Sequence, residues 1–241
     1  MLAEGRLYVG STDGNFFALD PATGVTRWRF DGNGSKICSA ASAAGDRVLF
    51  GTFDGSLFAL RKSDGGALWH LKLPASIVSA PVAYRNLAIV GGRDFLLHAY
   101  ALADGREIWR QHFWVSWIES TPRVVDGVLY IGSSDLRAVR ALDPRNGDVL
   151  WSTDVYGSAW ASPLVTRDTI YMGTAGVKDY VIDHRAAIVA LDRRSGQIRW
   201  RRSEPQTPDS PVWGHPGSLS LAGDVILATG LDGMLLALPA K

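Results

Sequence analysis

The sequence has little cysteine and almost no net charge. The first absence excludes certain kinds of site, and the second argues against one kind of partner. Cys38 is the only cysteine among 241 residues, so an internal disulfide and a thiolate metal site are both excluded. The 25 basic and 24 acidic side chains give a formal net charge of +1, which argues against a nucleic-acid partner. The five histidines show no recurring ligand spacing, so no metal site is predicted.

Long apolar runs are also absent from the sequence. None approaches the roughly 20 residues that a membrane-spanning helix needs, so no transmembrane segment is predicted. The first residues, MLAEGRLYVG, have neither the basic start nor the apolar stretch of a secretory signal peptide. An exported protein would need a leader that this sequence does not show, and composition alone leaves the compartment unknown.

Glycine and tryptophan are abundant, and an internal repeat explains most of both. The chain has 26 glycines and nine tryptophans. Five segments of eleven residues align without gaps, each with alanine first, glycine seventh and tryptophan eleventh. They are ALDPATGVTRW (18–28), ALRKSDGGALW (59–69), AYALADGREIW (99–109), ALDPRNGDVLW (141–151) and ALDRRSGQIRW (190–200), and a sixth copy begins at Ala237. A period of roughly forty residues indicates a repeat architecture.

Two further elements recur upstream of each motif. A short run such as LYVG (7–10) or IYMG (170–173) indicates a buried strand, and a segment such as STPRVV (120–125) precedes it. Each unit is therefore a four-strand meander, with strands A to D in chain order and the motif joining C to D. Four short strands in each unit, with no helical pattern between them, predict an all-β fold, a β-propeller in which each unit is one blade.

We predict a single propeller domain over residues 1–241. The first unit begins at its strand B and the last ends at its strand C, so both are expected to be incomplete. The alternatives are a ring of six blades and a piece of a seven- or eight-bladed ring, of which we favour the larger ring. Unpaired blade edges would promote association with other chains. The units lie at about 1–30, 31–71, 72–111, 112–153, 154–202 and 203–241.

The pattern Ala-x-Asp-x-x-(Thr/Ser/Asn)-Gly-x-x-x-Trp resembles the tryptophan-docking motif of pyrroloquinoline-quinone-like repeat propellers. The resemblance runs from Gly5 to Leu238. Quinoprotein dehydrogenases carry this motif, and so does the non-enzymatic lipoprotein family of outer-membrane β-barrel assembly, which the chain is closer to in type. The resemblance implies a bacterial protein of the periplasm or cell envelope. It defines the fold better than the function, because one fold hosts many functions.

The motif residues are predicted to be structural. The glycines suit a turn that needs a positive φ, and the resemblance implies that each indole packs on the turn of the next blade. Arg61 and Ala101 replace the motif aspartate in the second and third copies, which removes a turn-capping carboxylate there. The structural residues are Gly24, Gly65, Gly105, Gly147 and Gly196, with Trp28, Trp69, Trp109, Trp151 and Trp200.

The four remaining tryptophans and two insertions point to one face of the propeller. The tryptophans lie in or beside the links from strand D to the next strand A, and these links share a face with the B–C loops, at the mouth of the channel. One insertion, VKDYVIDHR (177–185), is a B–C loop, and the other, SEPQTPDSPVWGH (203–215), is a D–A link. Elaborated loops on one face of a repeat scaffold are typical of a binding surface.

We therefore predict a non-catalytic binding or scaffolding propeller that recognises a protein or peptide at this face. Aromatic side chains with arginine and histidine nearby have the composition of an interaction hot spot. The predicted binding residues are Trp114, Trp117, Glu119, Tyr156, Trp160, His184, Arg185, Trp213 and His215. For each tryptophan, the alternative is that the side chain only plugs the channel or packs between blades.

The alternative function is a quinone- or small-ligand-binding propeller related to quinoprotein dehydrogenases. The resemblance implies that such an enzyme binds pyrroloquinoline quinone with calcium, beside a catalytic aspartate and in many members a pair of adjacent cysteines. One cysteine cannot form that pair. Calcium needs several oxygen ligands, whereas Glu119 is the only acid in the aligned positions that face the channel. We predict no cofactor, no catalytic residue and no enzymatic activity.

Overall fold

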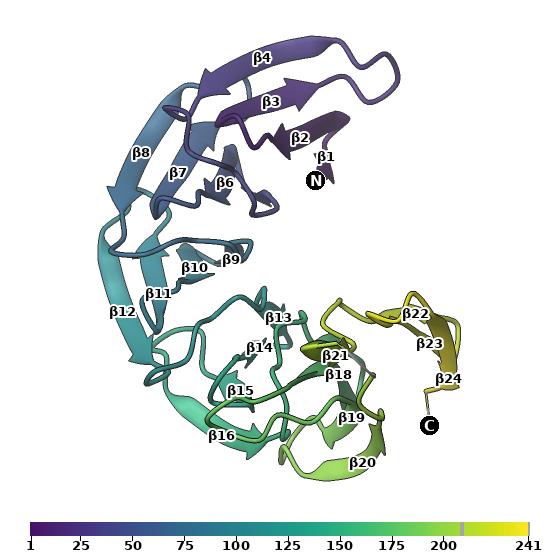
Figure 1. Ribbon diagram of the computed structural model, residues 1–241. Helices are drawn as coiled ribbons and strands as arrows, with labels where there is room; N and C mark the ends of the chain where they lie inside the picture. Colours follow the sequence, from purple (N-terminus) through teal and green to yellow (C-terminus); the bar gives the residue numbers. More distant parts are fainter. Residues whose placement is uncertain (208–209, 241) are drawn as a thin grey trace. The chain divides into compact units, whose positions relative to one another are not determined.

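The computed structural model describes residues 1–207 and 210–240, and all of the regular elements in these residues are β-strands (Figure 1). None of this described part forms a helix that could cross a membrane. The strands form six antiparallel sheets. The prediction of an all-β propeller is confirmed. The chain divides into two compact units, Met1–His112 and Phe113–Lys241, and each is described by itself.

The first unit contains three sheets, each a four-strand meander in which strands that follow each other in sequence are hydrogen-bonded. The first sheet holds β1 (Leu2–Ala3), β2 (Arg6–Gly10), β3 (Asn15–Leu19) and β4 (Thr26–Asp31). The second holds β5 (Ser42–Ala44), β6 (Arg47–Gly51), β7 (Ser56–Arg61) and β8 (Ala67–Lys72). The third holds β9 (Val82–Tyr84), β10 (Leu87–Gly91), β11 (Leu96–Ala101) and β12 (Glu107–His112).

The second unit continues the same pattern and then departs from it. Its first sheet holds β13 (Arg123–Val125), β14 (Val128–Gly132), β15 (Ala138–Leu142) and β16 (Val149–Asp154). The next holds β17 (Leu164–Val165), β18 (Thr169–Val177), β19 (Ala187–Asp192) and β20 (Ile198–Ser203), and β21 (Val212–Gly214) pairs with β18. The last holds β22 (Ser220–Ala222), β23 (Val225–Thr229) and β24 (Leu235–Pro239).

The first sheet differs from the sequence prediction. We expected the first repeat to begin at strand B, but β1 supplies a short strand A, with Leu2 opposite Leu7 and Ala3 opposite Arg6. This strand is only two residues long and lacks the serine-containing segment that marks strand A elsewhere, so the sequence pattern did not reveal it. The last sheet shows three strands among the described residues, as expected.

Every copy of the motif forms the same bulged turn. The pairing register shifts directly after the motif alanine in all five copies. The five motif glycines have φ between +73° and +79°, a left-handed conformation that favours glycine. In the first copy, Gly24 N–H donates to the carbonyl of Asp20 at 2.8 Å, and the Asp20 carboxylate accepts bonds from Ala22 N and Thr23 N.

The two copies without the aspartate replace its carboxylate by another route. Asp64 accepts a bond from Gly66 N in the second copy, and Asp104 accepts one from Arg106 N in the third. Each acceptor lies three residues further along the turn than the missing motif aspartate. The turn is therefore kept although the capping carboxylate has moved.

The motif tryptophan docks on the turn of the next sheet. Trp28 Nε1 donates to the carbonyl of Lys62 at 2.9 Å, and Trp69 Nε1 donates to that of Leu102 at 2.9 Å. The glycine makes room for the ring, since a Cβ built on Gly65 would lie 2.6 Å from Trp28 Cε3. One indole therefore joins two sheets through both packing and a hydrogen bond, as the resemblance implied.

Two of the five motif tryptophans are less buried than the other three. Trp28, Trp69 and Trp109 are buried, but Trp151 and Trp200 are only half-buried. A cavity of about 520 Å³ opens beside Trp151, and Trp200 packs against the last sheet, which has three strands in the described part of the chain. The burial of the ring therefore depends on how completely the next sheet covers it.

Candidate functional site

The two insertions predicted from the sequence lie against each other in the second unit. β18 runs on to Val177, and its last residues pair with β21 of the inserted link, with Ala175 opposite Gly214 (Figure 1). A single bridge also joins Val177 to His184 in the other insertion. One strand end therefore holds both loops. Pro208 and Asp209 of the inserted link lie outside the described residues.

Three of the predicted binding residues are buried where the insertions meet. Trp213 lies flat against β18, because a Cβ on Gly176 would be 2.3 Å from its Cε2. His184 Nδ1 donates to the carbonyl of Ile182 at 2.7 Å, and His215 N–H donates to that of Thr174 at 3.1 Å. His184, Trp213 and His215 hold the insertions in place and are buried themselves.

The other predicted residues differ in exposure. Trp114 has 75% of its surface exposed, and Trp117 and Tyr156 are also exposed. Arg185 is exposed and pairs with Asp183 at 2.6 Å. Trp160 and Glu119 are half-buried, and the Trp160 Nε1 atom is buried without a hydrogen bond. The structure thus separates the predicted residues into a surface group and an interior group.

Hydrogen bonds connect two of the loops that carry the surface group through a third loop between them. The carbonyl of Trp117 accepts a bond from Ser134 N at 3.2 Å, which ties the link at residues 113–117 to the β14–β15 loop. Arg137 in that loop donates to the carbonyl of Asp183 at 2.6 Å. The Tyr180 hydroxyl bonds to Asp135, and this bond raises the pKa of Tyr180. The insertion at residues 177–185 and the link at residues 113–117 are therefore both hydrogen-bonded to the β14–β15 loop.

Tyr156 lies beside two arginines. The Arg201 and Arg137 guanidinium carbons are 5.4 Å and 5.8 Å from the centre of its ring, which is cation–π distance. The carbonyl of Tyr156 accepts a bond from Arg185 N at 2.6 Å. Burial lowers the pKa of Arg201, and the nearby Arg185 lowers it further, although an arginine stays charged in any ordinary environment. The exposed ring thus lies among three arginines, two of which, Arg137 and Arg185, are paired with Asp154 and Asp183.

Together these loops form what we call the aromatic surface. It comprises the exposed residues Trp114, Val115, Trp117, Tyr156, Tyr180, Val181 and Ile182. The sequence prediction named three of the seven and missed the others. The run Tyr180-Val181-Ile182 was the available signal, because three apolar residues stand there in an inserted loop, where polar residues are the rule, and Val181 is 98% exposed.

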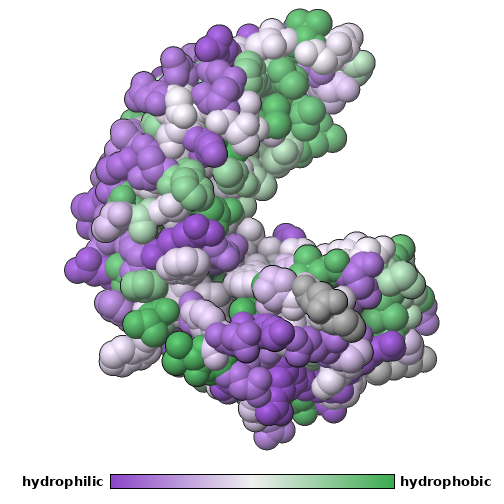
Figure 2. Space-filling model, in the orientation of Figure 1, coloured by the Kyte–Doolittle hydropathy of each residue, from purple (hydrophilic) through white to green (hydrophobic). Residues whose placement is uncertain are grey.

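A second apolar surface covers the last sheet (Figure 2). Leu221, Leu231, Met234 and Leu235 are exposed there, and β24 is paired with β23 alone among the described strands. Association through such an unpaired edge stays a prediction.

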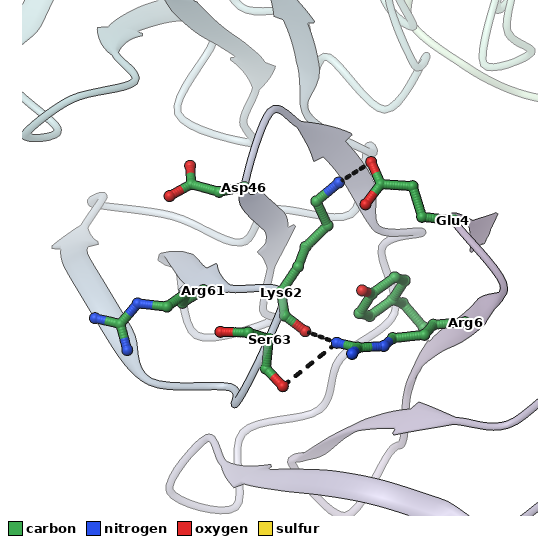
Figure 3. Close-up of a pocket in the computed structure, with 7 residues that line it drawn as sticks. Glu4, Arg6, Asp46, Arg61, Lys62 and Ser63 are labelled. Atoms are coloured by element: carbon green, nitrogen blue, oxygen red, sulfur yellow. Dashed lines mark hydrogen bonds and ion pairs between the residues drawn. The ribbon is translucent and has the colours of Figure 1, made fainter.

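The cavity drawn in Figure 3 lies between the first two sheets and is already occupied by the protein's own ion pairs. Its volume is about 330 Å³. The buried Lys62 places its ammonium 2.5 Å from Glu4 Oε1, and Arg6 donates to the Lys62 carbonyl at 2.5 Å. Arg61 pairs within its own turn. Because each cation has a partner, we interpret this cavity as a cross-link between sheets and not as a ligand site.

The second unit repeats this cross-link with different residues. The buried Arg193 donates to Asp126 at 2.6 Å and to the Tyr130 hydroxyl at 3.1 Å. Arg193 occupies the motif position of Lys62, and Asp126 occupies the turn position of Glu4. The sequence analysis missed both pairs, because only two of the five motif copies carry a basic residue at this place.

The side chains present do not fit pyrroloquinoline quinone with calcium. Within residues 1–207 and 210–240 no cluster of three or more His, Cys, Asp or Glu side chains is placed to hold a metal ion. Calcium takes six to eight oxygen ligands. Cys38 is exposed and single, so it cannot supply the paired cysteines of such enzymes.

Comparison with known proteins identifies the family. The family model of the outer membrane protein assembly factor BamB matches residues 1–82 and 74–241. The chain belongs to this family. BamB of Yersinia pestis is 30% identical over 214 residues, covering 83% of this chain and 51% of the relative. The chain spans about half the length of the curated relatives it matches.

Two further matches bear on fold and activity. BamB from Moraxella catarrhalis matches with a TM-score of 0.72 at 19% identity, covering 97% of this chain and 81% of that one, which shows the shared fold. Quinohemoprotein alcohol dehydrogenase ADH IIB of Pseudomonas putida is 26% identical over 230 residues, covering 82% of this chain and 32% of the enzyme. The BamB relatives confirm the prediction of a bacterial-type, non-enzymatic member of this repeat class.

Proposed function

We propose that this BamB-family chain is a non-catalytic binding propeller whose aromatic surface contacts a protein partner during the assembly of outer-membrane proteins. The names of its relatives support a part in the assembly of outer-membrane proteins. The exposed aromatic side chains support the aromatic surface as the place of contact. The same resemblance supports a place in the periplasm or cell envelope. A peptide or protein segment is the expected partner, because a net charge of +1 gives a nucleic acid little to bind.

The observation that carries the proposal is strained backbone at two exposed aromatic residues. Trp114 and Tyr156 have φ of 51° and 60° and stand five residues after a motif tryptophan, where the first repeat has Asn33 at φ 60°. Asparagine adopts this left-handed conformation readily, whereas a bulky side chain there is an outlier. Because the rings are exposed, their packing offsets little of that backbone strain. A binding role therefore explains these residues better than a folding role.

The chemistry of the surface favours an extended segment with apolar side chains. Aromatic rings supply contact area at low conformational cost, and the arginines beside Tyr156 favour an acidic or carbonyl-rich neighbour. An extended peptide stacks its side chains on the rings while its backbone bonds to loop groups. Trp160 and Glu119 are half-buried, so we expect them to contribute less to the contact. His184, Trp213 and His215 are buried and hold the insertions in place.

Site-specific photo-crosslinking in the cell envelope tests the proposal. A benzoylphenylalanine residue replaces Trp117, and a matched variant carries it at Val149, which is also exposed but lies on the outer strand β16. We expect a discrete crosslinked product with an outer-membrane assembly protein from position 117 and none from position 149. Equal products from both positions, or none from position 117, would contradict the proposal.

The alternative, a quinone-binding propeller, has one observation in its favour, the match to the Pseudomonas putida enzyme. The side chains present count against it, because they do not assemble the oxygen ligands that calcium needs. Adding pyrroloquinoline quinone and calcium to the purified chain separates the two functions, because a binding propeller for proteins shows no change in melting temperature or in the absorbance of the quinone.

A further inference from the structure

A small cavity lies where the inserted link meets the last sheet. Its volume is about 250 Å³, and residues 204–207, Gly214, His215, Gly230 and Asp232 line it. Pockets for whole ligands run from roughly 300 to 1,000 Å³, so this one fits a single side chain better than a complete small molecule. We call it the Glu204–His215 pocket.

Two buried polar atoms in this pocket have no hydrogen-bond partner. His215 is only 6% exposed, and neither its Nε2 nor Glu204 Oε1 forms a hydrogen bond. The two atoms are 3.6 Å apart. Arg202 Nε lies 3.4 Å from the same carboxylate oxygen without hydrogen-bonding it. Buried polar atoms in native proteins are nearly always paired, so this pair calls for a donor.

The tautomer of His215 shows which of its two ring nitrogens needs a hydrogen-bond donor. Its Nδ1 lies 3.2 Å from the carbonyl oxygen of Thr229, and a carbonyl only accepts, so Nδ1 carries the proton. In the neutral ring Nε2 is then an acceptor. It faces a carboxylate oxygen, which is also an acceptor. Two acceptors turned toward each other need a donor between them.

A third acceptor stands at the same cavity, and backbone bonds fix all three. Asp232 accepts Met234 N at 3.0 Å through one carboxylate oxygen, which leaves the other oxygen available. Glu204 N–H donates to the carbonyl of Ala186 at 3.0 Å, and Leu231 N–H donates to that of Gly214 at 3.0 Å. Three segments therefore place an imidazole and two carboxylates in the lining of one small space, and no lysine or arginine is part of that lining.

We propose that the Glu204–His215 pocket binds a primary ammonium group, the side chain of a lysine in the partner protein. An ammonium has three donors, no acceptor and a positive charge, which match an imidazole nitrogen and two carboxylates. The inference rests on the proposed function for the source of the lysine, but the pocket's chemistry is independent of the aromatic surface. It adds a charge-selective contact to a surface that otherwise recognises apolar groups.

The competing state is an internal ion pair. A doubly protonated His215 would donate from Nε2 to Glu204 and satisfy both atoms without a ligand. Nitrogen NMR of the imidazole in the free protein at neutral pH distinguishes the states, because a protonated Nε2 and a lone-pair Nε2 have different chemical shifts. We expect the lone-pair form, and an imidazolium bonded to Glu204 would overturn the proposal.

The binding test uses the purified chain with Nα-acetyl-lysine methylamide as the probe and the norleucine analogue, which lacks the ammonium, as its control. We expect saturable shifts of the His215 ring signals with the lysine probe and none with norleucine. The Glu204→Gln variant should bind the lysine probe roughly tenfold more weakly, as expected for loss of one charged hydrogen bond. Asp224→Asn, an equal change of charge at the β22–β23 turn, should bind like the parent.

The proposal of a lysine pocket would be overturned if the lysine and norleucine probes bound equally well. It would also be overturned if Glu204→Gln and Asp224→Asn lost the same affinity for the lysine probe. The Trp114→Ala variant, carrying the crosslinker at position 117, separates these outcomes from failure of the proposed function. We expect it to bind the lysine probe normally while losing its crosslinked partner. A failed crosslinking experiment with intact lysine binding would reject the aromatic surface and leave the pocket standing.

Discussion

Tryptophan has two roles in this chain, and the exposure of the side chain separates them. Trp28 and Trp69 are buried and donate to the next sheet, so they hold the fold together. Trp114 and Trp117 are exposed in a link, and we propose that they serve binding. The spacing of the motif distinguished the two groups in the sequence, but it did not separate the exposed Trp117 from the buried Trp213, since both are leftover tryptophans in links.

Acidic turn residues make the stability of the chain depend on pH. The hydrogen bonds from Arg27 and then Thr23 lower the pKa of Asp20 to about 2. A carboxyl with a lowered pKa in the folded state stabilises that state above its unfolded pKa, near 3.9, and the effect disappears as pH falls through the folded value. We expect Asp20→Asn to be less stable than the parent at neutral pH, with a difference that shrinks between about pH 4 and about pH 2.

Urea unfolding midpoints of both proteins across this range check the expectation. Asp13 is a suitable second site, because its hydrogen bonds also lower its pKa but it lies outside the motif. A difference between parent and Asp20→Asn that stays constant down to about pH 2 would show that the carboxylate charge does not cap the turn.

At the scale of the element, the repeated turn explains why so much of the fold was predictable. The motif fixes a glycine at positive φ, a bulge after alanine and an indole on the next turn, and all three are local or involve neighbouring sheets. β1 was missed because two residues carry no pattern. The Lys62–Glu4 and Arg193–Asp126 pairs were missed because each joins residues of different repeats and recurs in only two places.

The candidate site was harder to predict for the same reason. The insertions were visible as extra length, but which of their side chains faces outward depends on the pairing of β18 with β21. That pairing buries Trp213 and His215 and leaves Tyr180 and Val181 exposed. Nothing in the local sequence of either loop encodes a contact between them.

Two glycine variants test the docking of the indole on the next turn. Gly24 and Gly65 have nearly equal φ, +73° and +75°, but a Cβ on Gly24 meets nothing within 4 Å, whereas a Cβ on Gly65 meets Trp28 at 2.6 Å. Gly24→Ala should cost only the backbone strain, about 1–2 kcal/mol. Gly65→Ala should cost a further 1–3 kcal/mol or so for overpacking.

Chemical denaturation gives the loss of unfolding free energy in each of the two variants, Gly24→Ala and Gly65→Ala. The backbone term is common to them, so the difference in unfolding free energy reports the contact with Trp28. Equal losses in Gly24→Ala and Gly65→Ala would mean that the tryptophan is not held against the turn.

At the scale of the whole molecule, the chain combines a repeated structural scaffold with one elaborated set of loops in its second unit. A single domain over residues 1–241 stays our proposal for how the two units behave. The family and the fold are those of BamB propellers, and the side chains present do not assemble a calcium and quinone site. The exposed aromatic residues are what remains for function to explain.

The central claim is that the aromatic surface serves binding and not folding, and Trp114→Asn tests it most directly. Asparagine suits the left-handed backbone at this position, and the lost ring is 75% exposed. We predict an unfolding free energy that is unchanged or raised by up to about 1 kcal/mol, together with a clear loss of the partner crosslinked through position 117. A destabilised protein that keeps its full crosslinking yield would contradict the account.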